Sequence, residues 1–285
     1  MKLPNLVGKP CILASVLMLG WTLIPQFAPA AIPSGEWQVE VSDPTNRVWD
    51  VTHIAPLQSP VVEFFDDGTV VSFNAPFTQN GSGKLAGAGA TDIEVTSSIV
   101  NGTVPGEYVA KGKITGAKGI ARLTFSSSVK GNAMIEGRPR AIASSFAVKV
   151  ALDSLTESPI GTYTSTASAA GYGSLNESGN VDISWQDVVA AMGDGSWTLH
   201  LSLTNDAVKK VGGTAVVDVS GGRTLGFTVK GTYNAKTDGT ILVLTADADS
   251  KGSSLKVTLS ASGSAALQGK LTGQTIKAVG TLEPD

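Results

Sequence analysis

Two stretches of this chain carry the pattern of antiparallel β-hairpins, and this pattern constrains the fold more than any other feature. Val109–Gly131 reads as an apolar strand with a Lys-Gly step, a turn, and a second apolar strand that ends in another Lys-Gly step. Thr228–Gly252 follows the same plan. Apolar and polar residues alternate from Ala121 to Lys130, which predicts a sheet with one solvated face. We interpret the Lys-Gly steps as turns and bulges whose lysines lie on that face.

Other segments have the same period of two. Glu36–Val41 and Trp197–Leu203 each place a tryptophan and aliphatic residues on one face, and Val61–Phe73 forms two short apolar runs around Asp66-Asp67-Gly68. Asp-Gly supplies the positive φ that tight hairpin turns require. Gly is abundant at 33 residues and charged residues are only 16% of the chain, a composition typical of short strands and tight turns.

We therefore predict an all-β fold, in which antiparallel hairpins and meanders form two similar barrel- or sandwich-like modules. One continuous large sheet is the alternative. An outer-membrane barrel is less well supported, because its aromatic girdles are hard to build from 6% aromatic residues.

The modules are predicted to span residues 31–157 and 158–285, with the boundary at Leu155–Pro159. Several echoes suggest internal repeats: the glycine block in Gly81–Val95 returns in Gly171–Trp185 at one constant offset. The two blocks lie on opposite sides of the tryptophan strands in the two halves. The echoes therefore indicate related hairpins reused in two halves, while a true tandem duplication stays open.

The first thirty residues have the features of a cleaved signal peptide. Lys2 and Lys9 precede a largely apolar run from Cys11 to Phe27, and Ala28-Pro29-Ala30 is a small-x-small cleavage site. An uncleaved membrane anchor is the alternative, although the run is short for a span and contains Pro25. We expect an exported protein, periplasmic, on the cell surface or extracellular, with no transmembrane span in the mature chain.

Cleavage would remove the only cysteine, so the mature protein is expected to lack disulfides and thiol chemistry. It would also change the formal net charge from −3 to −5, because two lysines are lost. This mild acidity gives no electrostatic reason to expect nucleic-acid binding.

Four stretches of the C-terminal half resemble a type of exported bacterial repeat protein that is rich in Gly, Thr and Ser and largely uncharacterised. They are DGSWTLHLSL (194–203), TLGFTVKGTYNAK (224–236), GSSLKVTL (252–259) and LQGKLTGQTI (267–276). The similarity is best over about the last ninety residues and thin before Gly81. The resemblance implies a secreted β module and no particular activity.

No constellation of catalytic residues is visible in the sequence. His53 lies in a proline-rich connection and His200 on the polar face of a strand, and neither has a partner at a recognisable spacing. Asp247 and Asp249, followed by Gly252, are the best candidates for a metal site, although calcium needs six to eight oxygen ligands. We predict no cofactor. Glycosidase-type carboxylate pairs stay open, because distance in space defines them.

Trp49, Tyr172 and Trp185 are the candidates for a ligand-binding, sugar-stacking surface, since Trp37 and Trp197 alternate with core residues of their strands. The preferred prediction is an exported, non-enzymatic β-repeat protein with a structural or adhesive role at the envelope or outside, its partner an extracellular glycan or envelope component. The alternatives are a module that binds carbohydrate or a small apolar ligand, and a carboxylate-based hydrolase. A hollow or filled interior would discriminate between binding and structural roles.

Overall fold

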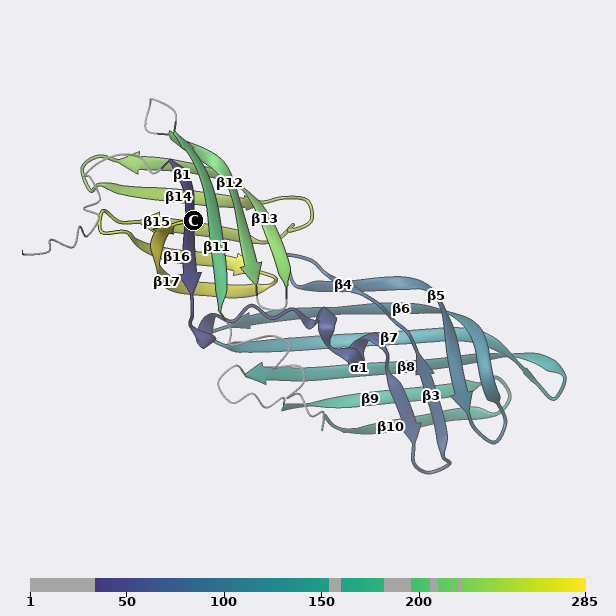
Figure 1. Cartoon of the computed structure of the whole chain (residues 1–285). Helices are drawn as coiled ribbons and strands as arrows, with labels where there is room; N and C mark the ends of the chain where they lie inside the picture. The colour runs from purple at the N-terminus through teal and green to yellow at the C-terminus, as the bar shows by residue number, and fades with distance from the viewer. Residues whose placement is uncertain (1–33, 154–159, 182–195, 206–209, 220–221) are drawn as a thin grey trace, which may run out of the picture.

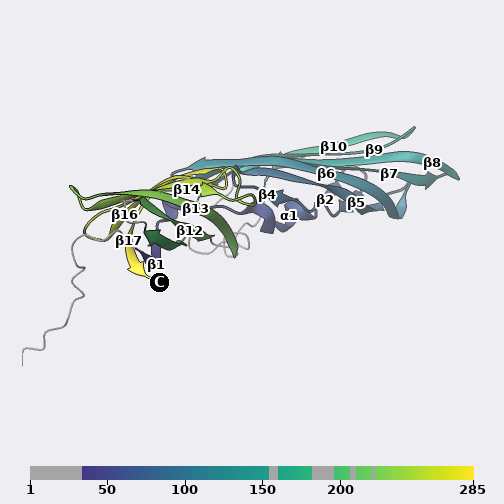
Figure 2. The same ribbon diagram turned by 90° about the horizontal axis from the view of Figure 1, so that it is seen from above.

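The computed structural model describes residues 34–153, 160–181, 196–205, 210–219 and 222–285. About 72% of the chain is strand and 4% is helix, which confirms the all-β antiparallel prediction. The strands form two bodies that lie end to end, one drawn mainly in green and yellow and the other in blue and teal (Figure 1). Figure 2 shows the elongated outline from above. No helix of the described segments is long and apolar enough to cross a bilayer. The predicted signal peptide lies outside these residues.

The first body is a closed antiparallel barrel of eight strands. Its members are β1 (Gly35–Val41), β11 (Trp197–Asn205), β12 (Lys210–Val219), β13 (Arg223–Asn234), β14 (Gly239–Ala246), β15 (Ser254–Leu259), β16 (Ser264–Leu271) and β17 (Gln274–Pro284). Seven of them follow one another as a meander. The eighth, β1, comes from the opposite end of the chain and closes the barrel by pairing with both β11 and β17.

Alternation along these strands fills the barrel with apolar side chains. The apolar face of β11 is buried as predicted, and it consists of Trp197, Leu199, Leu201 and Leu203. Phe227, Leu242 and Val257 from later strands pack into the same cluster. The outward positions are mainly polar, and on β11 they are Thr198, His200 and Ser202. Burying apolar surface stabilises a fold by about 25 cal/mol per Å². The filled interior is therefore the main stabilising feature of this body. We call it the closed barrel.

The second body, which we call the open module, is a curled sheet whose two edge strands are not paired with each other among the described residues. Its strands are β2 (Val61–Phe64), β3 (Thr69–Phe73), β4 (Thr78–Gln79), β5 (Lys84–Thr96), β6 (Asn101–Ala117), β7 (Ile120–Ile135), β8 (Arg138–Asp153), β9 (Ile160–Ala169) and β10 (Gly173–Asn180). The strand order is β2-β3-β5-β6-β7-β8-β9-β10, and β4 adds to β5 beside β3. The edge strands β2 and β10 approach each other, but no register in the described chain pairs them.

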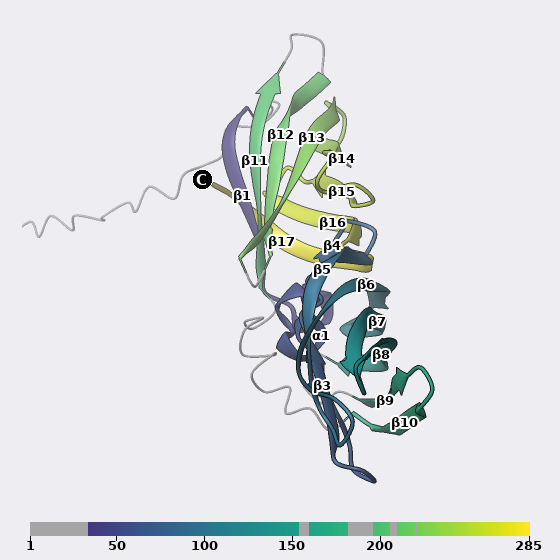
Figure 3. The same ribbon diagram turned by 90° about the vertical axis from the view of Figure 1, so that its right-hand side faces the viewer.

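The chain between β1 and β2 starts beside the closed barrel, where Asn46 bonds to Trp197 and Lys277, and runs inside this curled sheet from Trp49 to Leu57. It contains the short helices η1 (Pro44–Asn46), η2 (Val51–His53) and α1 (Ala55–Gln58). Trp49, Val51, Ile54 and Leu57 are 0–2% exposed and belong to the core cluster of the open module. Figure 3 shows α1 between the arm that carries β3 and the arm that carries β7 and β8. The proline-rich connection of the sequence therefore acts as part of the core.

The hairpin pattern at Val109–Gly131 is confirmed as β6 and β7, which pair over a long register. Their turn is Lys118-Gly119, with φ of 54° and 80°, as expected for a two-residue type I′ turn. The other two Lys-Gly steps are not turns or bulges, which corrects our interpretation. Gly112 lies within β6, where a Cβ atom would stand 2.4 Å from the carbonyl oxygen of Thr124. Glycine is needed there for a close approach of backbones.

Strand pairing groups the chain differently from the predicted division at residue 157. The strands β9 and β10 follow that point but pair with β8 and with each other. The strand β1 precedes it but completes the closed barrel. Hydrophobic alternation could not reveal this exchange, because a strand's pattern does not specify its neighbour. The residues 154–159 themselves lie outside the described chain.

A buried polar junction joins the two bodies. The Oε1 atom of Gln79 accepts from the Val51 amide at 2.9 Å, and its Nε2 atom donates to the Trp49 and Thr272 carbonyls. Gln274 also bonds to the backbone of Trp49. Its Oε1 atom accepts from the Trp49 amide, and its Nε2 atom donates to the Trp49 carbonyl. Next to this network, β17 and β6 pair in parallel for two residues. These contacts connect the bodies rigidly, since each buried amide would be costly to leave unpaired.

Candidate functional site

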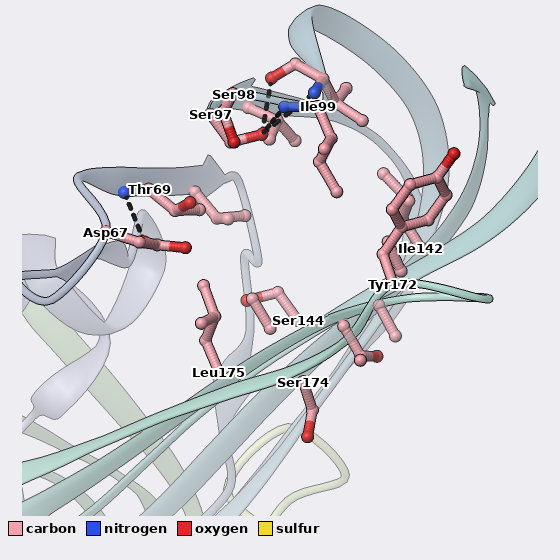
Figure 4. Close-up of a pocket in the computed structure, with 18 of the residues that line it drawn as sticks. Asp67, Thr69, Ser97, Ser98, Ile99, Ile142, Ser144, Tyr172, Ser174 and Leu175 are labelled. Carbon is pink, nitrogen blue, oxygen red and sulfur yellow. Dashed lines mark hydrogen bonds between the residues drawn. The ribbon is translucent and has the colours of Figure 1, made fainter. Parts of the chain in front are cut away.

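The open module has a cleft at the end that lies far from the closed barrel. Its volume is about 250 Å³. The hairpin β2–β3, the turn between β5 and β6, and the strands β8, β9 and β10 enclose it (Figure 4). The apolar part of its lining consists of Val71, Ile93, Val95, Ile99, Val100, Ile142, Ala167, Ala169 and Leu175. Clefts with an apolar lining and a few polar groups are the usual form of small-molecule sites.

The floor of the cleft is hollow because small residues occupy its central row. Ser144 on β8 stands opposite Ala167 on β9, which stands opposite Leu175 on β10. All three side chains face inward by the alternation of their strands. The Leu175 side chain points into the gap, whereas Ser174 next to it points away (Figure 4). In the closed barrel the corresponding volume is filled by leucine and phenylalanine side chains.

Tyr172 stands at the rim, in the turn between β9 and β10, and is 39% exposed. A hydrogen bond from its hydroxyl to the Glu136 carboxylate raises the pKa of Tyr172, and desolvation and the charge of Glu136 act in the same direction. Arg140 opposes the shift. The ring is thereby fixed beside Ile142 at one side of the opening (Figure 4).

The opposite side of the opening is built from two tight turns. The Ser97 hydroxyl accepts from the backbone amides of Ile99 and Val100, and the Asp67 carboxylate accepts from the Thr69 amide at 2.9 Å. Ile99 remains 43% exposed above the cleft. Such side chain-to-backbone bonds stiffen loops that carry binding residues.

Of the three aromatic candidates, one lines the cleft, one is buried and one lies outside the described residues. Tyr172 lines the cleft, and its predicted role in ligand binding stays a prediction. Trp49 is 2% exposed in the core, so its ring offers no stacking surface, and a guanidinium from Arg47 lies 5.1 Å from its centroid. Trp185 lies outside the described residues. Nothing in the sequence around Trp49 distinguished a buried connection from an exposed loop.

Two buried hydroxyls lie one row below the floor. Ser127 on β7 and Ser165 on β9 both stand opposite Phe146 on β8, so the three form one inward-facing row. Both serines are at most 2% exposed, and neither hydroxyl has a hydrogen-bond partner among the described residues. Buried hydroxyls without partners are unusual. This row therefore adds polar groups to an otherwise apolar interior.

Asp247 and Asp249, the predicted calcium ligands, belong to no larger group of metal-ligating side chains among the described residues. The described residues contain no group of three His, Cys, Asp or Glu side chains that could hold a metal ion. Asp247 and Asp249 are exposed in the loop after β14, where Asp247 accepts from the Thr228 hydroxyl at 3.4 Å. A calcium site at this pair stays a prediction.

His200 has partners that its sequence position did not indicate. Its Nδ1 atom lies 2.7 Å from the Asp285 carboxylate, and its Nε2 atom lies 3.5 Å from the Asp218 carboxylate. The strands β11 and β12 and the C-terminus bring the three residues together on the outer face of the closed barrel. His53 is exposed at the end of η2. Each ring nitrogen of His200 already faces one of these carboxylates, so we interpret the three residues as a cluster of polar contacts on the surface of the barrel.

Comparison with protein-family models, with curated proteins and with solved structures gives no match for this chain. The resemblance to exported repeat proteins stays a prediction, and the cleft supplies the remaining argument about function. Its lining was not predicted as a set, because it combines residues from five strands and three turns whose proximity depends on the curl of the sheet.

Proposed function

We propose that this protein is an exported, non-enzymatic binding protein whose open module takes a small, mainly apolar ligand into the cleft. One observation carries the proposal: an accessible, aliphatic-lined hollow lies in one body, while the other body is filled. This favours the alternative of a small-apolar-ligand module over a purely structural role. Among the described lining residues Asp67 alone is a carboxylate, so a glycosidase-type pair gains no support at this place.

The lining favours an amphipathic ligand. The floor is aliphatic apart from Ser144, whose hydroxyl donates to the Thr166 carbonyl, whereas the rim carries hydroxyls of Ser97, Ser98 and Tyr172. A ligand with an apolar body and one polar end would bury the body and leave the polar end at the rim. The volume of about 250 Å³ lies just below the usual range of small-molecule sites. We therefore expect one medium-length acyl chain, or the end of a larger molecule.

A matched pair of substitutions on β10 tests this proposal. Leu175→Glu places a carboxylate in the cleft, and Asn176→Glu places the same group on the opposite face of the same strand. We expect Leu175→Glu to weaken displacement of Nile red by dodecanoate about tenfold or more, because a charge would be buried without a partner. Asn176→Glu should bind like the natural protein. Equal binding by both variants, or no displacement at all, would refute the proposed site.

A structural or adhesive role is the second candidate, supported by the filled closed barrel and its rigid junction with the open module. It predicts that ligand addition leaves the midpoint of thermal unfolding unchanged. A ligand that binds only the folded state must raise that midpoint, so dodecanoate titration of the unfolding midpoint separates the two roles.

A further inference from the structure

The outer face of the open module carries a cluster of lysines near the junction with the closed barrel. Lys84 on β5 stands directly opposite Lys113 on β6, and Lys113 stands opposite Thr124 on β7, which stands opposite Lys149 on β8. Lys111 lies two residues from Lys113 on the same face. All four lysines are exposed. We call these four residues the basic face.

The arrangement brings like charges close together. Neighbouring strands are about 4.8 Å apart, and residues two apart on a strand are separated by about 7 Å. A directly opposed pair such as Lys84 and Lys113 is destabilising when nothing neutralises it. No ion pair involves the basic face within the part of the chain that the structure describes. An anion bound across these strands would remove the repulsion.

Outward carboxylates are sparse around the basic face, although the chain as a whole is acidic. Asp153 is the nearest outward carboxylate at this end of the sheet, one diagonal step from Arg122, and the next outward acids, Asp92 and Glu107, lie toward the far end of β5 and β6. The outer face of the closed barrel is mixed in charge. Glu36 and Glu40 on β1, Asp218 on β12 and Asp285 at the C-terminus are acidic, whereas Lys230, Lys256, Lys270 and Lys277 are exposed on β13, β15, β16 and β17.

Hydroxyl groups fill the positions between and beside the lysines. Thr124 and Ser126 lie on β7, and Thr162 and Thr164 continue the same two rows on β9. The outward positions of β6 to β9 at this end thus present cations and hydroxyls in register. This combination can bind charged groups and also hydrogen-bond neighbouring hydroxyls of a sugar chain.

We propose that the basic face binds an acidic polysaccharide, a linear sugar chain with carboxylate, sulfate or phosphate groups, which lies across strands β5 to β8. Three observations support a polyanion of this type: the register of the lysines, the absence of neutralising partners within the described chain, and the hydroxyl rows. An anionic bilayer is the competing partner. It is less well matched, because no aromatic side chain stands among Lys84, Lys111, Lys113, Lys149 and the hydroxyl rows to enter the interface. The proposal is independent of the cleft.

The test compares two triple variants of equal charge. Lys111, Lys113 and Lys149 are changed to Gln in one, and Lys230, Lys236 and Lys256 on the closed barrel are changed to Gln in the other. Binding of polygalacturonate is measured by titration over a series of salt concentrations, with neutral dextran as the uncharged control. We expect the first triple variant to bind about tenfold more weakly and to show a shallower salt dependence, because three cation–anion contacts are lost. The second should bind like the natural protein.

Three results would overturn the proposal: equal weakening in both triple variants, no binding of polygalacturonate by the natural protein at low salt, or binding only to vesicles of phosphatidylcholine and phosphatidylglycerol. The last result would identify a membrane surface as the partner. Folding is monitored separately, and Lys113→Gln alone should raise the midpoint of thermal unfolding, because it removes a repelling neighbour of Lys84.

Discussion

The closed barrel and the open module are made from strands of the same kind and both bury an apolar core, yet the cleft lies at one end of the open module. Both alternate apolar and polar residues and both are antiparallel meanders. In the closed barrel, β1 arrives from the far end of the chain and pairs with both edges. In the open module the connection from Trp49 to Leu57 enters the interior, and the edges β2 and β10 remain unpaired among the described residues. The cleft thus lies in the body whose two edge strands are not joined to each other within the described chain.

Side-chain size reinforces the difference. The interior of the closed barrel contains Phe227, Leu199, Leu225 and many other large residues. The cleft row of the open module has Ser144 and Ala167 at its centre, and the row below has Ser127 and Ser165. Small inward-facing residues on a curled sheet leave volume that a ligand can occupy.

The largest expected effect concerns closure itself. Val39 on β1 is 0% exposed, so Val39→Asp would bury a charge in the filled barrel and should lower the free energy of unfolding by about 4 kcal/mol or more. The same substitution at Leu175 on the open edge should cost about 1 kcal/mol, because that side chain is only partly buried. Urea denaturation measures both. Gln38→Asp on the outer face of β1 is the control, and similar losses for Val39→Asp and Leu175→Asp would contradict the contrast.

The next effect concerns the junction that couples the two bodies. Gln79→Leu would leave the Val51 amide and the Trp49 carbonyl without one of their partners, which we expect to cost about 2–3 kcal/mol. Because the network joins the bodies, we expect the natural protein to unfold in one transition and Gln79→Leu to unfold in two. Calorimetry tests this, with exposed Gln268→Leu on β16 as the control. A single, unshifted transition in Gln79→Leu would mean that the junction does not couple them.

A smaller effect is expected where β1 leads into the connection. Asp43 caps η1 by accepting from the Thr45 amide and hydroxyl, and these bonds lower the pKa of Asp43. Asp43→Ala should cost about 1 kcal/mol at neutral pH. Since the folded-state pKa is lowered, this contribution is present above the ordinary pKa of aspartate and disappears as the pH falls through the folded value. Urea denaturation at several pH values measures it, and a loss that persists in strong acid would contradict the assignment.

The smallest expected effect is a change in the pKa of a tyrosine that is hydrogen-bonded to a carboxylate. Each body contains one such pair. Glu136 raises the pKa of Tyr172 at the cleft, and Asp238 raises that of Tyr233 in the closed barrel, where the hydroxyl donates to the carboxylate at 2.6 Å. Glu136→Gln should lower the pKa of Tyr172 alone, and Asp238→Asn that of Tyr233 alone. The hydrogen bond belongs to the neutral tyrosine, so it is lost as the pH rises through the folded pKa. Ultraviolet titration with Tyr→Phe variants as references checks both. If the pKa of Tyr172 is the same in Glu136→Gln as in the natural protein, the hydrogen bond between Tyr172 and Glu136 is not formed.

The sequence predicts local structure well and long-range arrangement poorly. Period-two alternation identified the hairpin around Asp66-Asp67-Gly68, the strand from Trp197 and the hairpin at Val109–Gly131. It could not show that β1 belongs to the C-terminal barrel or that Trp49 is buried, because both depend on contacts between distant segments. Of the predicted site residues, Tyr172 was found at the cleft. The apolar floor was missed, since its residues look like ordinary core positions when each strand is read alone.

Hydrogen–deuterium exchange of the whole chain, with and without dodecanoate, tests the central claim most directly. We predict slow exchange throughout β1 and β11 to β17, fast exchange on the edge of β10 that has no strand partner among the described residues, and added protection by dodecanoate only in the cleft segments 67–71, 93–100, 142–144 and 167–175. Protection of the β10 edge equal to that of β1, or ligand-dependent protection within the closed barrel, would contradict the account of one filled and one open body.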